Sequence, residues 1–244
     1  MELRLIGIGM GALGHVTLDG MESLRGVRTI LLPQKGAGKE DLAHLRERII
    51  EASGTAARIV TFDYPTRDPA FDYATRVELW HDEIARRWSA ALEGSESPVA
   101  LLVWGDPSLY DSTLRIAARL DPAPQVRVIP GITALQALTA AHAIPLNRVN
   151  GPVTITTGRR LRDEGWPEGA ETVAVMLDGE CSFQTLPQDD LWIWWGAYLG
   201  MEEEVLHAGP LPGTTPDILA TREAERARHG WIMDTYLLRR GPGG

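Results

Sequence analysis

The chain has 244 residues, a formal net charge of −9 and one cysteine, Cys181. At about 100–200 residues per domain, this length predicts one large domain or two small ones. A single cysteine excludes an internal disulfide and a cluster of cysteine metal ligands, and it favours a reducing compartment, the cytoplasm. The acidic balance argues against nucleic-acid binding, and no apolar run reaches the roughly 20 residues that span a membrane.

Strands and helices are predicted to alternate along the first half of the chain. Short apolar runs predict strands at 3–7, 29–32, 58–62 and 99–104, and amphipathic spacing predicts helices at 17–25, 40–52, 73–92 and 112–120. This alternation is typical of a largely parallel sheet.

The Asp121-Pro122-Ala123-Pro124 segment has the composition of a hinge, so we expect domains at 1–121 and 122–244. In the second half, strands are predicted at 126–129, 153–157, 171–177, 191–197 and 230–238, and helices at 132–143, 202–207 and 217–228. The last strand is a candidate partner for 191–197. The predicted fold class is α/β, with two halves that each hold a mostly parallel or mixed sheet flanked by helices.

A glycine-rich loop, Gly7-Ile8-Gly9-Met10-Gly11-Ala12-Leu13-Gly14, follows the first predicted strand. Its Gly-x-Gly-x-x-Gly spacing fits the dinucleotide fingerprint, so an NAD(P)-dependent oxidoreductase is one alternative. That fingerprint expects an acidic residue after the second strand, where this chain reads Leu31-Leu32-Pro33-Gln34-Lys35. The missing acid counts against this alternative, and a tight turn that binds nothing is another interpretation.

Two further loops follow predicted strands. One reads Trp104-Gly105-Asp106-Pro107-Ser108-Leu109-Tyr110-Asp111-Ser112, and the other reads Pro130-Gly131-Ile132-Thr133-Ala134. Open α/β sheets bind ligands at the carboxyl ends of their strands, so these loops predict a small-molecule site. Thr133 is a candidate cap for the following helix and a candidate ligand donor.

In this order and spacing, the three loops resemble those of the tetrapyrrole (precorrin/corrin) methyltransferase family. The family's first loop usually reads Gly-x-Gly-Pro-Gly-Asp, so Met10 and Ala12 depart from it, whereas the other two loops match fully. The resemblance implies a two-domain α/β fold with S-adenosyl-L-methionine in a cleft between the domains, S-adenosyl-L-homocysteine as product, and often a homodimer. The first domain would form the substrate and cofactor cleft wall, and the second would complete the cofactor site.

Further segments, among them Ile144-Pro145-Leu146-Asn147 and Thr156-Thr157-Gly158-Arg159-Arg160-Leu161, narrow the resemblance to one branch of the family. This branch implies a cobalamin (vitamin B12) biosynthesis enzyme that methylates C1 of precorrin-5 and releases acetate. Methylation of a different corrinoid carbon remains an alternative.

The resemblance also assigns functional residues. It implies cofactor contacts by Gly9, Met10, Trp104, Gly105, Asp106, Tyr110, Thr133, Ala134, Met176, Leu177, Ala197, Tyr198, Trp231 and Ile232. Transfer of a sulfonium methyl group depends on positioning and on excluding water, so no nucleophile or metal is expected. Release of acetate calls for a general base or polarising donor, for which Tyr110 and Asp106 are the candidates.

A precorrin carries many carboxylates, so an acidic protein needs local cations to hold one. The candidates are Lys35, Arg159, Arg160 and His15, with solvated surface charge and a structural histidine as the alternatives. The tryptophans at 192, 194 and 195 are candidates for a dimer interface or for the core of their own sheet.

Overall fold

The computed structural model describes residues 1–34, 40–66, 68, 70–187 and 189–241, with no description of the side chains of 40–43. The chain forms two compact units, Met1–Ile132 and Thr133–Gly244. This division differs from the one expected at 121 and 122. The strand predicted at 126–129 is hydrogen bonded to the first strand of the chain and therefore belongs to the first unit.

The first unit contains a parallel five-stranded sheet. Its strands are β1 (Glu2–Gly7), β2 (Thr29–Pro33), β3 (Arg58–Phe62), β4 (Val99–Val103) and β5 (Gln125–Ile129), in the order β3-β2-β4-β1-β5. Every neighbouring pair is parallel, which confirms the prediction. All five carboxyl ends therefore lie at one edge, and the loops that follow the strands gather there.

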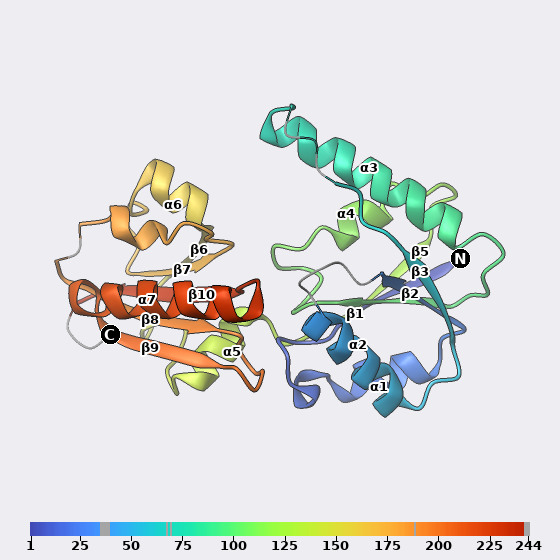
Figure 1. Cartoon of the computed structure of the whole chain (residues 1–244), viewed down its shortest axis with the longest axis horizontal. Coiled ribbons are helices and arrows are strands. Elements are labelled where there is room, and N and C mark those ends of the chain that lie inside the picture. Colours follow the sequence, from blue (N-terminus) through green and yellow to red (C-terminus); the bar gives the residue numbers. More distant parts are fainter. Residues whose placement is uncertain (35–39, 67, 69, 188, 242–244) are drawn as a thin grey trace. The chain divides into compact units, whose positions relative to one another are not determined.

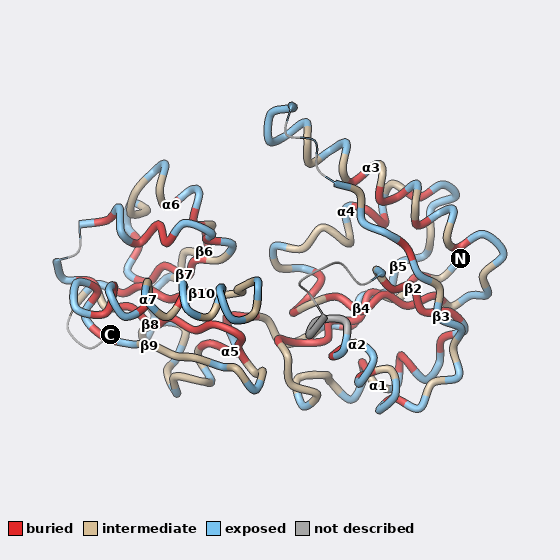
Figure 2. The backbone as a smooth tube through the Cα atoms, in the orientation of Figure 1, coloured by how far each residue is buried: buried red, intermediate tan, exposed pale blue. Residues whose placement is uncertain are grey.

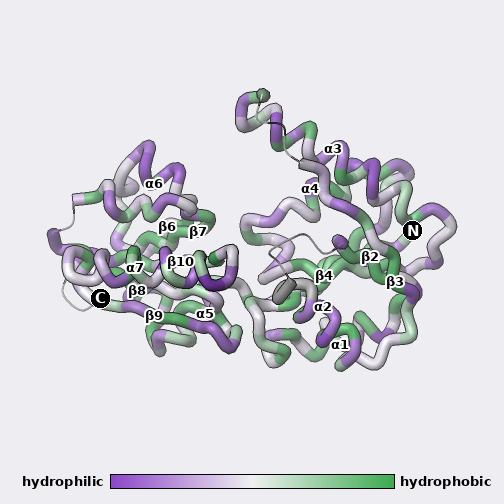
Figure 3. The backbone as a smooth tube through the Cα atoms, in the orientation of Figure 1, coloured by the Kyte–Doolittle hydropathy of each residue, from purple (hydrophilic) through white to green (hydrophobic). Residues whose placement is uncertain are grey.

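Helices cover both faces of this sheet (Figure 1). The helices are α1 (Leu18–Arg25), α2 (Glu40–Ser53), α3 (Tyr73–Ala91) and α4 (Thr113–Ala117), with a 3₁₀ turn at Leu13–His15. Along β4, Val99, Leu101 and Val103 pack with α3 and α4, whereas Ala100 and Leu102 pack with α1 and α2. Side chains alternate across a strand, so an apolar run such as β4 is buried on both faces (Figures 2 and 3).

The second unit contains a mixed five-stranded sheet. Its strands are β6 (Val153–Thr157), β7 (Thr172–Met176), β8 (Leu191–Ala197), β9 (Val205–Pro210) and β10 (Asp234–Arg240), in the order β6-β7-β10-β8-β9. β6 and β7 are parallel, and the other pairs are antiparallel. The expected pairing of the last strand with 191–197 is confirmed. The helices are α5 (Ala134–Ala141), α6 (Gly158–Glu164) and α7 (Leu211–His229), with a 3₁₀ turn at Ser182–Thr185.

Three sequence predictions in the second unit were wrong or incomplete. The helix predicted at 202–207 is replaced by β9, whose residues 205–210 pair antiparallel with β8. Six residues form too few helical hydrogen bonds to compete with an available sheet edge. Helix α7 begins six residues before the predicted 217, with Pro216 inside it, and α6 was not predicted.

None of the helices in the described ranges combines the length and apolar character needed to cross a membrane. Trp194 and Trp195 are both buried within their own unit, with 6% and 0% of their surface exposed. Trp195 belongs to the core of its own sheet, which was one of the two alternatives, whereas Trp194 packs against Trp192 and Arg239.

Candidate active site

Two glycine loops are joined at the carboxyl edge of the first sheet. The N–H of Gly9 donates to the carbonyl of Gly105 at 3.2 Å, and the N–H of Gly105 donates to the carbonyl of Gly9 at 2.9 Å. Both residues have positive φ values, 73° and 66°, which favour glycine. The loop after β1 is therefore fixed against the loop after β4.

The backbone of the third loop of the first unit lies close to the backbones of both other loops. A Cβ atom on Gly131 would lie 2.2 Å from the carbonyl oxygen of Gly105 and 2.7 Å from the carbonyl carbon of Gly7. A Cβ atom on Gly7 would lie 2.6 Å from the nitrogen of Gly131. These distances leave no room for a side chain, so glycine is required at both positions and the three backbones form a continuous surface, the glycine cradle.

The carboxylate of Asp106 holds two of these loops together. One oxygen, Oδ1, accepts from the backbone and the hydroxyl of Ser108, and the other, Oδ2, accepts from the N–H of Gly131 at 2.8 Å. Burial alone would raise the pKa of Asp106, but the hydrogen bonds from Ser108 and Gly131 outweigh it and lower the pKa below its usual value. A carboxylate engaged in this way is a weak proton acceptor, so the geometry favours positioning over proton transfer.

The dinucleotide fingerprint does not fit the structure. Its third glycine should bring a helix against the strand, yet a Cβ atom on Gly14 would have no neighbour within 4 Å. The residue that follows β2 is Gln34 rather than an acid. His15, from the 3₁₀ turn that follows, contacts Gly9 and accepts from the N–H of Met10 through Nδ1 at 3.4 Å.

The loop after β4 has an inner and an outer part. The indole of Trp104 packs against the cluster beneath α1 and α2, and its Nε1 is buried without a hydrogen-bond acceptor among the described residues. Tyr110 has a positive φ of 48° and is 41% exposed. The predicted residues of this loop therefore separate into a buried group beside the cradle and an exposed tyrosine.

Thr133 begins helix α5 in the second unit. Its hydroxyl accepts from the N–H of Leu135 at 3.2 Å, and its own N–H donates to the side chain of Gln136 at 3.1 Å. This capping box confirms that Thr133 caps the helix. Ala134, the next residue, is buried.

Three predicted segments converge at one edge of the second sheet. β7 and β8 both run antiparallel to β10, so their carboxyl ends, Met176 and Ala197, lie on either side of the start of β10. Tyr198 donates from its hydroxyl to the carbonyl of Trp231 at 2.5 Å, with the two rings edge to face at 5.1 Å. The partly buried Ile232 packs against the same core.

Leu177 is the most exposed of these predicted residues. It follows β7 with a positive φ of 55°, and 66% of its surface is exposed. Leucine seldom adopts the left-handed region. The residue presents an apolar side chain to solvent at the carboxyl end of β7.

A buried polar network holds the loop that follows Leu177. The carboxylate of Asp178 accepts from the hydroxyl of Tyr236 at 2.6 Å and from the backbone of Ser182 at 2.6 Å. Arg222 of α7 donates to the carbonyl of Asp178 at 3.0 Å and pairs with Asp234 at 2.8 Å. Burial alone would lower the pKa of Arg222, but Asp234 outweighs it and the pKa is raised.

Sequence reasoning missed this network, although one signal was available. A carboxylate directly after a strand, as in Leu177-Asp178-Gly179, is a typical loop acceptor. Arg222 gave no such signal, because an arginine in a surface helix is usually solvated. Within the network, burial raises the pKa of the Cys181 thiol to about 11, so the thiol stays protonated at neutral pH.

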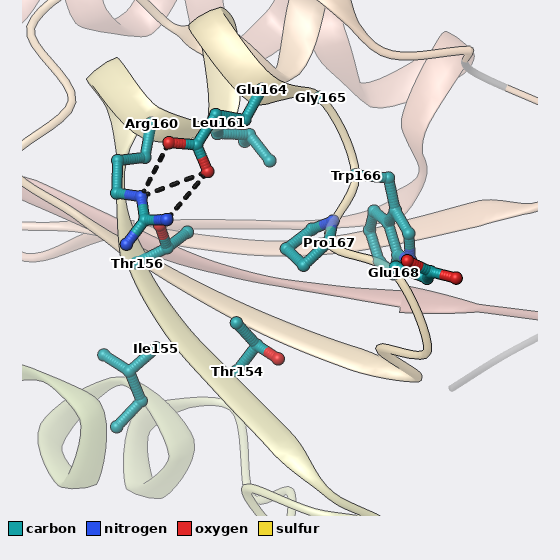
Figure 4. Close-up of a pocket in the computed structure, with 10 residues that line it drawn as sticks. All are labelled: Thr154, Ile155, Thr156, Arg160, Leu161, Glu164, Gly165, Trp166, Pro167 and Glu168. Atoms are coloured by element: carbon teal, nitrogen blue, oxygen red, sulfur yellow. Dashed lines mark hydrogen bonds and ion pairs between the residues drawn. The ribbon is translucent and has the colours of Figure 1, made fainter.

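The residues predicted to hold the substrate carboxylates include Arg160, Arg159 and Lys35. Arg160 forms an ion pair with Glu164 at 2.8 Å on the wall of a pocket of about 310 Å³ beside β6, α6 and Trp166 (Figure 4). Arg159 precedes it on the same helix and is exposed. Lys35 lies outside the described residues. No group of three side chains suited to a metal ion occurs in the part of the chain that the structure describes.

Comparison with known proteins bears on this arrangement. A family model described as Tetrapyrrole (Corrin/Porphyrin) Methylases matches residues 2–213. A curated protein of Sinorhizobium sp, Precorrin-6A synthase (deacetylating), is 45% identical over 250 residues, which cover 98% of this chain and 95% of that protein.

Solved structures of two related proteins are also similar to this chain. A protein from Corynebacterium diphtheriae, described as a cobalamin synthesis related protein (CobF), superposes with a TM-score of 0.82 at 38% identity, covering 98% of this chain and 99% of its own. A uroporphyrin-III C-methyl transferase from Thermus thermophilus, complexed with S-adenyl homocysteine, has a TM-score of 0.57 at 16% identity, covering 98% and 92%. The second likeness is one of fold alone.

Proposed function

Because the chain belongs to the tetrapyrrole methylase family, we propose that it is an S-adenosylmethionine-dependent methyltransferase of cobalamin biosynthesis. Its substrate is precorrin-5, which it methylates at C1 with release of acetate to give precorrin-6A. The observation that carries this proposal is the 45% identity, over 98% of the chain, to a protein named for that reaction. The glycine cradle supplies a matching feature of the chain itself, a backbone surface that admits no side chain.

The residues present fit S-adenosylmethionine. In the first unit, Gly9, Met10, Trp104, Gly105, Asp106 and Tyr110 contribute to its site; in the second, Thr133, Ala134, Met176, Leu177, Ala197, Tyr198, Trp231 and Ile232 do. The glycine cradle lets a ligand approach the backbone closely, and exposed Leu177 suits an adenine face. The indole N–H of Trp104, buried without an acceptor among the described residues, is a donor beside the cradle.

When bound, the cofactor supplies an electrophilic methyl group on its sulfonium centre. The protein's part is to hold the accepting carbon in line with that methyl and to exclude water. Asp106 positions the second loop against the third through Gly131. For acetate release, a water molecule adds to the acetyl carbonyl before the carbon–carbon bond breaks, and the exposed phenol of Tyr110 is the group that holds or moves its proton.

The acidic chain holds a polycarboxylate through local cations. Lys35, Arg159, Arg160 and His15 are the residues proposed for this role. Arg160 already pairs with Glu164, and the hydrogen bond from Arg160 lowers the pKa of that glutamate, so it offers less to a ligand. Arg159→Glu should weaken binding of precorrin-5 but not of S-adenosylhomocysteine, and equal precorrin-5 isotherms for variant and parent would refute its role.

A cytoplasmic location and a homodimer complete the proposal. A single buried cysteine suits a reducing compartment. Trp192, on the same strand as the two buried tryptophans, is partly exposed and is the remaining candidate for an interface.

Two measurements test the function. Calorimetric titration with S-adenosylhomocysteine should give saturable binding, whereas NADPH should give none. Incubation with precorrin-5 and S-adenosylmethionine should then yield one acetate per methyl transferred. Methylation without acetate would place the reaction on a different corrinoid carbon, and binding of NADPH alone would overturn the proposal.

A further inference from the structure

One partly buried arginine of the first unit has a guanidinium nitrogen without an acceptor among the described residues. Arg46 lies in the second turn of α2, and its Nε is fully buried with no hydrogen-bond partner among the described residues. Burial lowers the pKa of Arg46, and among the described residues Tyr64 opposes this shift. A buried guanidinium N–H without an acceptor is costly, because it has lost its hydrogen bond to water.

The arginine belongs to the same sheet edge as the glycine cradle. Tyr64 comes two residues after the end of β3, and it is within electrostatic range of both Arg46 and Asp111, which lies in the loop after β4. Helix α2 follows β2, so its first turns begin at the carboxyl ends of the strands. The tyrosine ring stacks on Trp80 at 5.8 Å, which fixes its position.

The strand order separates this pair from the cradle by a defined interval. The cradle lies over β4, β1 and β5, whereas Arg46 and Tyr64 follow β2 and β3. From β1 to β3 there are three strand spacings, roughly 14 Å at about 4.8 Å each. This interval lies within the span of a tetrapyrrole macrocycle and its peripheral side chains.

From this placement, and on the basis of the proposed function, we propose that Arg46 and Tyr64 form a subsite for a carboxylate of the tetrapyrrole substrate. The guanidinium donates to the carboxylate, and the Tyr64 hydroxyl is the second donor. Because the site lies wholly in the first unit and apart from the cradle, it contributes to substrate affinity and leaves cofactor affinity unchanged.

The test compares Arg46→Gln with Arg48→Gln, which removes an exposed arginine from the same helix. For Arg46→Gln we expect KM for precorrin-5 to rise by about 10- to 100-fold, the effect of losing one charged hydrogen bond. Binding of S-adenosylhomocysteine should match that of Arg48→Gln, and the urea midpoint should equal or exceed that of Arg48→Gln, because the substitution removes a buried donor without an acceptor. A KM equal to the parent's would overturn the inference. If the urea midpoint is also lowered, the role of Arg46 is structural.

Two additions keep the outcome decisive. Tyr64→Phe removes only a hydroxyl and should raise KM by about 2- to 10-fold, which remains measurable if the glutamine variant does not fold.

Titration with uroporphyrin III, a stable polycarboxylate macrocycle, separates this inference from the proposed function. If the parent binds uroporphyrin III, Arg46→Gln weakens that binding, and the parent forms no precorrin-6A, only the proposed function is refuted. If the parent is active, and Arg46→Gln changes neither uroporphyrin binding nor KM for precorrin-5, only the inference is refuted. A parent that neither reacts with precorrin-5 nor binds uroporphyrin refutes both.

Discussion

Replacing Gly131 with alanine should disrupt the glycine cradle without changing any polar group. The new Cβ would lie 2.2 Å from the carbonyl oxygen of Gly105, whereas ordinary contact begins near 3.4 Å, so the two backbones must separate by about 1 Å. That movement also stretches the 2.8 Å hydrogen bond from the Gly131 N–H to Asp106 beyond its useful range.

The cost follows from these two effects. Overpacking against a fixed backbone costs about 1–3 kcal/mol, and loss of a hydrogen bond to a charged group costs about 1.5–3 kcal/mol. The displacement that breaks the hydrogen bond also relieves part of the overlap, so the two costs are not fully additive. We expect the free energy of unfolding to fall by about 3 kcal/mol. S-adenosylhomocysteine affinity should fall with it, because the backbone surface of the cradle changes shape.

The assay is urea denaturation followed by tryptophan fluorescence, with calorimetric titration of S-adenosylhomocysteine. Gly14→Ala is the matched control, since its Cβ meets nothing within 4 Å and its φ is not positive. If Gly131→Ala unfolds within about 0.5 kcal/mol of Gly14→Ala and keeps its affinity, the close approach of the three loops is not the reason for glycine there.

Three further predictions concern single side chains. Asp106→Asn should lose about 1–3 kcal/mol of unfolding free energy at pH 7. Because the folded pKa of Asp106 is lowered, its contribution is present above the unfolded pKa and lost as pH falls through the folded pKa, so urea titrations at acid pH should bring variant and parent together. Arg222→Gln should lose about 3–5 kcal/mol by leaving Asp234 buried without its partner, whereas Arg226→Gln, at an exposed site on the same helix, should match the parent in urea. Leu177→Asn should leave the urea midpoint unchanged or higher, because asparagine tolerates the left-handed conformation. It should weaken the binding of S-adenosylhomocysteine by about 10-fold, because an apolar contact is lost. Unchanged affinity would show that Leu177 is not part of the cofactor site.

Local patterns in the sequence predicted most of the elements. The apolar runs at 29–32 and 99–104 predicted the inner strands β2 and β4, since a strand buried on both faces must be continuously apolar. The runs at 3–7 and 58–62 predicted β1 and the edge strand β3, which is mostly exposed. The loop residues from Trp104 to Ser112 gave the family resemblance that the comparisons confirmed. Secondary structure was predicted less accurately for short segments. Six residues such as 202–207 show too little periodicity to distinguish a helix from a strand that pairs with β8.

The sequence by itself therefore determined the fold class, the three loops and the family. The tertiary structure decided which of those residues contact one another. Gly7, Gly105 and Gly131 come into backbone contact because the order β4-β1-β5 places three distant strand ends side by side, and periodicity does not encode strand order. The same order turns Asp106 from a candidate base into the acceptor that joins two loops, and it places Arg46 and Tyr64, which follow β2 and β3, at the far end of the edge.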